Sequence, residues 1–277
     1  MDLEQKYSKL KEILTEMETV VVAYSGGVDS TFLLKVAADV LGENVLGVTS
    51  ASETISNREL ADAENFIKLI GASHEIIYTD ELNDHSFNSN PVNRCYYCKK
   101  ELFSKLLEIA KARGFKYVVD GANHDDRGDF RPGITAGREL GVRSPLQEAS
   151  LTKDDIRILS KRLGLPTWNK PAKACLSSRF PYGEQITPTK ITQVEEAENF
   201  LDDLGFSQFR VRHHGPLARI ELLSEEIALA MDINNREKII AKLKDLGFSY
   251  VTIDMQGFRS GSMNEVISAN SEASTDE

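Results

Sequence analysis

The chain has 277 residues, of which 41% are hydrophobic, 27% charged and 8% aromatic. This is the composition of an ordinary globular protein, so disordered, collagen-like and low-complexity classes are excluded. The net charge of −10, from 33 Lys and Arg against 43 Asp and Glu, disfavours a general nucleic-acid binder, because such proteins neutralise phosphates with basic side chains. The length is typical of about two domains.

The N-terminal 18 residues predict an amphipathic helix with Leu3, Tyr7, Leu10 and Leu14 on one face, and they do not resemble a signal peptide. No apolar run reaches the roughly 18–20 residues of a membrane span. We therefore expect a cytoplasmic protein with no membrane partner. The three cysteines, an odd number, argue against a disulfide framework.

Up to about residue 165, short apolar runs alternate with helical patterns. Strands are predicted at 19–24, 44–50, 74–79 and 116–120, and helices at 29–41, 56–70, 96–113 and 152–163. Strands separated by helices of this length predict crossover connections and a parallel sheet. Because the strands are almost wholly apolar, we expect helices on both faces of the sheet. The predicted fold class is α/β.

A passage rich in Pro, Gly and Ser at residues 165–188 interrupts this pattern, and a smaller α+β pattern follows. Helices are predicted at 189–204 and 234–246, and strands at 208–214, 218–223 and 250–254. We therefore expect two domains, residues 1–180 and residues 181–277.

The first predicted strand leads directly into the motif SGGVDS at residues 25–30, where a helix begins. Two glycines allow the backbone to approach an anion, and a helix N-terminus presents N–H groups to it. The motif is not a Walker A loop, because no Gly-Lys-Ser/Thr follows at the required spacing. An acid within a phosphate cradle suits a Mg²⁺ ligand, and Asp29 has that position. The alternative is a strand-to-helix turn that merely needs glycines.

The fourth predicted strand leads into DGANHDDRGDFRPG at residues 120–133. Its polar side chains should lie at the same edge of the sheet as the first motif. Candidate metal ligands are Asp125, Asp126 and Asp129, and candidate phosphate ligands are Arg127 and Arg131. The alternative is a solvated loop.

The cysteines form a further motif. Cys95 and Cys98 lie at the start of a predicted helix, and Cys175 lies in the loop ACLSSRFPYG. A helix N-terminus and neighbouring basic residues favour thiolates. Four interpretations remain open: an iron–sulfur cluster with one open iron site, a reactive Cys175 beside a redox pair, structural zinc with a His ligand, and purely structural thiols.

The motif at residues 25–30 matches the signature SGGxDS, and the chain resembles the PP-loop ATP pyrophosphatase superfamily. The resemblance implies an adenine-nucleotide α-hydrolase-like fold. It also implies ATP cleavage between the α and β phosphates, with an adenylated carboxyl or carbonyl intermediate. The residues that it assigns to ATP are Ala23, Ser25, Gly26, Gly27, Asp29, Ser30 and Gly121, with Asp29 as the Mg²⁺ ligand and a catalytic residue.

Further stretches are similar to the LarE sulfur transferases over nearly the whole chain. They are ACLSSRFPYG, SPLQEA (144–149), RVR (210–212), RIEL (219–222) and GFRSGSMN (257–264). This family converts both carboxylates of pyridinium-3,5-biscarboxylic acid mononucleotide into thiocarboxylates, on the route to the nickel-pincer nucleotide cofactor of lactate racemase. The resemblance implies that each carboxylate is adenylated, that sulfur attacks, and that AMP leaves.

The source of sulfur differs within the family. In one type, the cysteine at the position of Cys175 gives up its sulfur and becomes dehydroalanine. The present chain is more similar to a three-cysteine type, in which a 4Fe–4S cluster carries the transferable sulfide. The resemblance then assigns Cys95, Cys98 and Cys175 to the cluster, with Cys175 also catalytic.

Arginines supply candidate ligands for such a substrate. Arg210 and Arg212 are two residues apart on a predicted strand and therefore share a face, and Arg179 and Arg259 could join them to bind phosphate or carboxylate. The alternative is that these arginines pair with the abundant acids.

Three rival functions remain. A PP-loop tRNA thiolase usually needs a basic RNA-binding surface, which is not visible here. An amidotransferring synthetase would not need three cysteines, and a nucleotide-binding sensor domain would not need Asp29. We expect a small-molecule nucleotide substrate, no nucleic-acid partner, and a homo-oligomer with contacts in the C-terminal unit.

Overall fold

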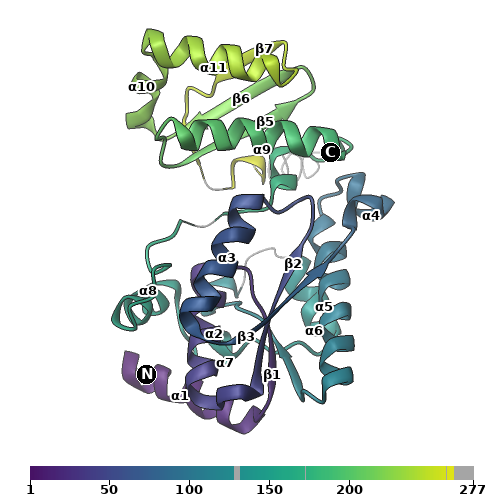
Figure 1. Ribbon diagram of the computed structural model, residues 1–277, viewed down its shortest axis with the longest axis vertical. Helices are drawn as coiled ribbons and strands as arrows, with labels where there is room; N and C mark the ends of the chain where they lie inside the picture. Colours follow the sequence, from purple (N-terminus) through teal and green to yellow (C-terminus); the bar gives the residue numbers. More distant parts are fainter. Residues whose placement is uncertain (128–131, 172, 260, 265–277) are drawn as a thin grey trace, which may run out of the picture. The chain divides into compact units, whose positions relative to one another are not determined.

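The computed structural model describes residues 1–127, 132–171, 173–259 and 261–264 (Figure 1). The chain divides into two compact units, Met1–Lys173 and Ala174–Glu277. The sequence places this boundary near residue 180, whereas the structure assigns Cys175 and Arg179 to the second unit.

The first unit contains an all-parallel sheet in the order β3-β2-β1-β4. Its strands are β1 (Val20–Ala23), β2 (Val45–Ala51), β3 (Ser73–Tyr78) and β4 (Tyr117–Val119). In the central register Val22 lies opposite Gly47 on one side and Val119 on the other. The predicted α/β class with a parallel sheet is confirmed.

Helices cover both faces of this sheet (Figure 1). They are α1 (Leu3–Met17), α2 (Val28–Leu41), α3 (Asn57–Ile70), α4 (His85–Asn88), α5 (Arg94–Arg113), α6 (Pro132–Glu139), α7 (Pro145–Glu148) and α8 (Lys153–Arg162). Successive side chains of a strand point to opposite faces. Val20 and Val22 accordingly pack with α1, α2, α3 and α8, whereas Val21 packs with α5.

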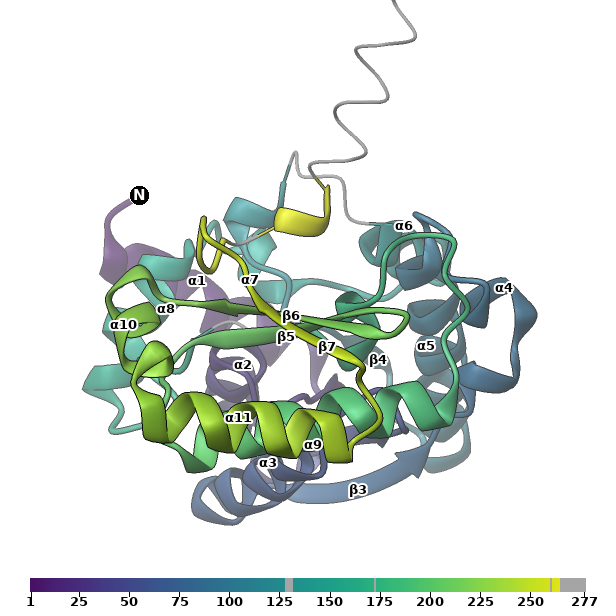
Figure 2. The ribbon, with the colours of Figure 1, turned by 90° about the horizontal axis from the view of Figure 1, so that it is seen from above.

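The second unit is a small α+β structure. It consists of α9 (Pro188–Asp203), β5 (Phe209–His214), β6 (Leu217–Leu222), α10 (Ile227–Met231), α11 (Ile233–Asp245) and β7 (Tyr250–Ile253). The sheet order is β5-β6-β7, with β5 antiparallel and β7 parallel to β6. Figure 2 shows α9 and α11 side by side along the sheet, where their apolar side chains pack against Val211 and Ile220.

The strand order fixes where a ligand can bind to the first unit. From β1 the chain builds outward through β2 and β3, and it then returns to the other side of β1 with β4. Ligands of such sheets bind at the carboxyl ends of the strands where the order reverses. Residues 25–30 follow β1 and residues 120–127 follow β4, so both segments lie at this edge.

Candidate functional site

The loop after β1 is held in shape by its own hydroxyl groups. The backbone N–H of Ser25 donates to Ser30 Oγ at 3.2 Å, the two serine Oγ atoms are 3.1 Å apart, and Ser30 Oγ donates to Gly27 O at 3.4 Å. Gly27 is the N-cap of α2 and makes no side-chain cap hydrogen bond. The first turn of α2 can therefore direct its N–H groups at an anion.

Two glycines allow the backbone to approach closely here. Gly26 has a φ of +68°, and a Cβ atom on it would lie 2.8 Å from Ala63 Cβ on α3. A Cβ on Gly121 would lie 3.0 Å from the backbone nitrogen of Ser30. Tyr24 fixes the same region, since its hydroxyl donates to Ala63 O at 3.2 Å and burial raises the pKa of Tyr24 to about 12. The two loops thus meet at the N-terminus of α2.

Asp29 lies in the first turn of α2. Its Oδ2 is 2.6 Å from Lys153 Nζ, and its buried Oδ1 has no hydrogen-bond partner in the part of the chain that the structure describes. A carboxylate oxygen without a donor beside a glycine-lined anion cradle fits a magnesium–nucleotide complex. Ala23, the last residue of β1, directly precedes this region.

Two lysines near the cradle were not singled out from the sequence. Lys153 begins α8, where its backbone N–H donates to Asp125 Oδ2 at 2.8 Å. Lys170 Nζ lies 3.5 Å from Gly26 O and 3.1 Å from Asp62 Oδ2. Both reach the cradle from distant parts of the chain, so no local spacing identifies them. For Lys153, the one signal in the sequence is its position just after the SPLQEA motif, at the start of a predicted helix.

The segment after β4 uses its polar side chains largely within the first unit. Asp120 Oδ1 accepts hydrogen bonds from Ala122 N–H and Ser144 Oγ, and burial raises the pKa of Asp120. Asp126 Oδ2 accepts from Asn123 N–H at 2.8 Å.

Other predicted ligands of this segment also have local contacts. Asp125 holds the start of α8, and Arg127 Nη2 donates to Gln147 O at 2.8 Å. Asp129 and Arg131 lie outside the described residues.

The three thiols are divided between the two units. Cys95 and Cys98 are the second and fifth residues of α5, exposed and half-buried respectively. Half-buried Cys175 precedes a 3₁₀ turn, η4 (Leu176–Arg179), in the second unit. None of them forms a disulfide. Among the described residues no group of three or more His, Cys, Asp and Glu could hold a metal ion. The predicted cluster therefore has no support in the geometry beyond the i, i+3 spacing of its first two cysteines.

Arg179 anchors the turn that carries Cys175. Its Nη1 donates to Ala174 O at 2.7 Å and to Cys175 O at 3.1 Å, while its Nε and Nη2 contact Glu198 at 2.8 and 2.7 Å. The Arg179 side chain is only 3% exposed. Burial opposes ionisation of Glu198, but Arg179 holds the pKa of this carboxyl below its ordinary value. The buried pair fixes the Cys175 turn to α9.

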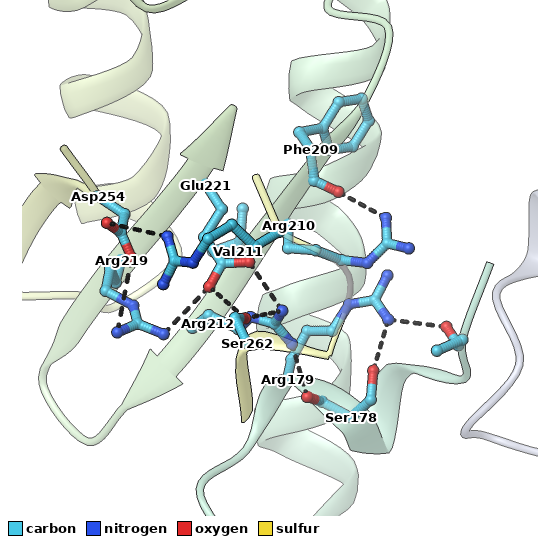
Figure 3. Close-up of polar contacts among 12 residues, drawn as sticks. Ser178, Arg179, Phe209, Arg210, Val211, Arg212, Arg219, Glu221, Asp254 and Ser262 are labelled. Carbon is cyan, nitrogen blue, oxygen red and sulfur yellow. Dashed lines mark hydrogen bonds and ion pairs between the residues drawn. The ribbon is translucent and has the colours of Figure 1, made fainter. Parts of the chain in front are cut away.

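Arg210 and Arg212, two of the other predicted substrate arginines, lie near this turn (Figure 3). Arg212 Nη1 donates to Ser178 O at 2.8 Å, and its Nη2 donates to Glu221 Oε2 at 2.7 Å. The Arg210 guanidinium lies 5.1 Å from the ring centroid of Phe258.

Arg259 belongs to the segment that follows β7. Its Nη1 donates to Gly257 O at 3.2 Å and lies 3.8 Å from Asp254 Oδ1. The structure therefore brings Arg179, Arg210 and Arg212 together, and it also gives several of the predicted arginines acidic partners.

Comparisons with known proteins match both parts of the chain. A family model described as NAD synthase matches residues 3–101. The chain is 46% identical over 265 residues to an uncharacterized protein of Synechocystis sp., covering 96% of this chain and 99% of that protein. It is 43% identical over 266 residues to the pyridinium-3,5-bisthiocarboxylic acid mononucleotide synthase of Lactiplantibacillus plantarum, covering 96% of each chain. An uncharacterized protein of Methanocaldococcus jannaschii is 32% identical over 259 residues, which cover 92% of this chain and 98% of that protein.

Proposed function

The chain belongs to the LarE family of PP-loop enzymes, and we propose that it is the ATP-dependent sulfur transferase that makes pyridinium-3,5-bisthiocarboxylic acid mononucleotide. Its substrate is the corresponding biscarboxylic acid mononucleotide, and the product serves nickel-pincer nucleotide synthesis. The observation that carries the ATP-dependent step is Asp29, whose buried Oδ1 has no hydrogen-bond donor among the described residues, beside the glycine-lined cradle.

In the first half-reaction a substrate carboxylate oxygen attacks the α-phosphorus of ATP. An acyl-adenylate forms, and the bond to the β-phosphate breaks to release pyrophosphate. Ser25, Gly26, Gly27 and Ser30 would bind the phosphates through N–H and hydroxyl groups. Asp29 would hold Mg²⁺, which compensates phosphate charge as the bond breaks.

Neighbouring residues complete this nucleotide site. Gly121 would keep the neighbouring loop clear of the phosphates, and Ala23 would contact the nucleotide from the end of β1. Lys153 contacts Asp29 and Lys170 lies beside Gly26 O, so both lysines could bind phosphate when nucleotide is present. Lysine is a common phosphate ligand.

Arg210, Arg212 and Arg259 would bind the phosphate or carboxylates of the substrate. Guanidinium groups bind these anions through paired hydrogen bonds. Arg179 would add positive charge at the same place while it holds the Cys175 turn. The contact of Arg212 with Ser178 O supports this assignment, because it links the arginine on β5 to the turn that bears the thiol.

In the second half-reaction, sulfur attacks the adenylated carbonyl carbon and AMP leaves, which yields the thiocarboxylate. We propose that Cys95, Cys98 and Cys175 hold a 4Fe–4S cluster, which when bound supplies a transferable sulfide. The i, i+3 placement of Cys95 and Cys98 on α5 fits two of the ligands. The alternative is that Cys175 itself gives up its sulfur.

Anaerobic reconstitution with iron and sulfide separates these two routes. The cluster route predicts brown protein with absorbance at about 400 nm. It also predicts that Cys95→Ala, Cys98→Ala and Cys175→Ala each lose both iron and activity. Full activity in iron-free protein would contradict it. Dehydroalanine at Cys175 in amounts that match product, seen by intact mass, would establish the sacrificial route instead.

We also propose that the protein is a cytoplasmic homo-oligomer. Leu229, Met231 and Ile233 are exposed around the junction of α10 and α11, which supports a contact through the second unit. Among the described residues no helix is both long and apolar enough to cross a membrane. Sedimentation analysis tests the oligomer: a monomer at working concentration would contradict it.

A further inference from the structure

Arg219 is the residue of the RIEL motif that the proposed mechanism leaves without a role. It lies on β6 directly opposite Arg212 on β5. Directly opposed side chains of an antiparallel pair have Cβ atoms about 4.5–5.5 Å apart, and like charges there are destabilising. Glu221 lies between them, with Oε2 at 2.7 Å from Arg212 Nη2 and Oε1 at 3.1 Å from Arg219 Nη2 (Figure 3).

Glu221 is satisfied without Arg219. Arg212 neutralises it, and Ser262 Oγ donates to its Oε1 at 3.1 Å. The second ion pair of Arg219, with Asp254, has a separation of 3.7 Å, which is beyond hydrogen-bonding distance. Glu221 therefore does not need Arg219 as a partner. Arg219 instead places a second positive charge directly opposite Arg212, which adds like-charge repulsion.

Arg219 is also more accessible than its neighbour. Its side chain is 31% exposed, whereas that of Arg212 is 6% exposed. The Nε atoms of both arginines are buried without a hydrogen-bond partner among the described residues. Each guanidinium therefore retains donor capacity, and a planar guanidinium is suited to binding a carboxylate through two parallel hydrogen bonds.

We propose that Arg219 binds the carboxylate of the substrate that is not undergoing adenylation. This assignment rests on the proposed function, in which the substrate carries two carboxylates on one rigid pyridinium ring and a phosphate on its ribose. While one carboxylate reacts, the other remains an anion that an arginine site of the second unit can bind. Arg212 and Arg219, side by side on neighbouring strands, offer two adjacent guanidinium groups to such a ligand. Arg219 thus favours substrates with two carboxylates and retains the half-converted nucleotide for its second thiolation.

A binding cycle tests this role directly. Affinities are measured for the biscarboxylic acid mononucleotide and for nicotinamide mononucleotide, which keeps the phosphate, the ribose and the pyridinium ring but carries one uncharged amide and no carboxylate. Arg219→Ala should lower the affinity for the first ligand by roughly tenfold or more, which is the lower range for loss of a charge-assisted hydrogen bond. It should lower the affinity for the second ligand by less than about threefold. Equal losses for both ligands, or no loss for either, would overturn the assignment.

Two further variants guard against a merely structural effect. Arg219→Lys keeps the charge and most of the packing but loses the planar donor pair. It should therefore still weaken binding of the dicarboxylate more than binding of the amide. Arg236→Ala removes an exposed arginine from α11, on the opposite side of the same sheet, and should change neither affinity. The assignment would be overturned if Arg219→Lys lost equal affinity for the two ligands. It would also be overturned if Arg236→Ala lost as much affinity for the dicarboxylate as Arg219→Ala does.

Product analysis distinguishes this inference from the proposed function. Wild-type protein that forms no thiocarboxylate would overturn the proposed function and the role of Arg219 with it. If wild-type protein reacts, Arg219→Ala should release more of the monothiolated nucleotide relative to the bisthiolated product. An unchanged product ratio would overturn the role of Arg219 alone.

Discussion

Replacing Arg179 with Ala should destabilise the second unit and release the turn that carries Cys175. The change removes a buried guanidinium that makes two hydrogen bonds to Glu198 and two to the carbonyls of residues 174 and 175. Glu198 would keep the hydrogen bond from Val211 N–H at 2.9 Å, but its charge would be left buried. Breaking a buried pair by removing one partner typically costs about 3–5 kcal/mol. We expect the free energy of unfolding of the second unit to fall by an amount in that range.

Urea unfolding followed by circular dichroism measures this loss. The matched control is the double variant Arg179→Met, Glu198→Leu, which removes both charges and retains apolar volume. Replacing a whole buried pair in this way is often close to neutral, so the control should cost far less than Arg179→Ala. If Arg179→Ala costs less than about 1 kcal/mol, the pair does not anchor the turn, and the reasoning fails.

The same pair predicts a dependence of stability on pH. The pKa of Glu198 lies below its ordinary value in the folded protein, so the pair contributes fully above the ordinary pKa of about 4.3. Its contribution is lost as the pH falls from that value through the lower pKa of the folded state. Arg179→Ala should therefore lose less stability than wild type over that acid range. Parallel losses in the two proteins would contradict the assignment.

Three further predictions concern ligands. Asp29→Ala should abolish substrate-dependent pyrophosphate release while the circular dichroism spectrum is kept, because the Mg²⁺ ligand is lost; wild-type rates would exclude the assignment. Gly121→Ala places a Cβ 3.0 Å from Ser30 N and should weaken ATP binding by about 1–3 kcal/mol in a titration. Gly42→Ala strains the backbone at a φ of +58° but at the other end of α2, so it should not weaken ATP binding. Arg210→Ala should weaken substrate binding by about 1.5–3 kcal/mol with little change for ATP, and the opposite pattern would mean that the two pockets have been confused.

The sequence predicts the strands and long helices because their apolar spacing is strong. The predicted strand at 44–50 is observed at Val45–Ala51, and the predicted helix at 56–70 is observed at Asn57–Ile70. The short helices α4 and α7 were not predicted, because four residues are too few to display a helical period. The position of the PP-loop was predictable because strand, glycines and helix are contiguous.

The partners of the site residues were not predictable. Lys153 meets Asp29 across 124 residues, and Arg212 meets Ser262 across 50, so only the tertiary fold brings them together. The spacing of Arg210 and Arg212 predicts that they share a face of a strand, but it cannot tell that Arg212 is paired with Glu221. The alternative interpretation, arginines paired with acids, describes part of what the structure contains.

The central claim is that ATP activates a substrate carboxylate as an acyl-adenylate before sulfur replaces an oxygen. This can be followed with the biscarboxylic acid mononucleotide labelled with ¹⁸O in its carboxylates, under single-turnover conditions. The account predicts that AMP and pyrophosphate form only with substrate and that AMP gains one ¹⁸O for each thiocarboxylate made. Formation of ADP and phosphate, or unlabelled AMP alongside thiolated product, would contradict it.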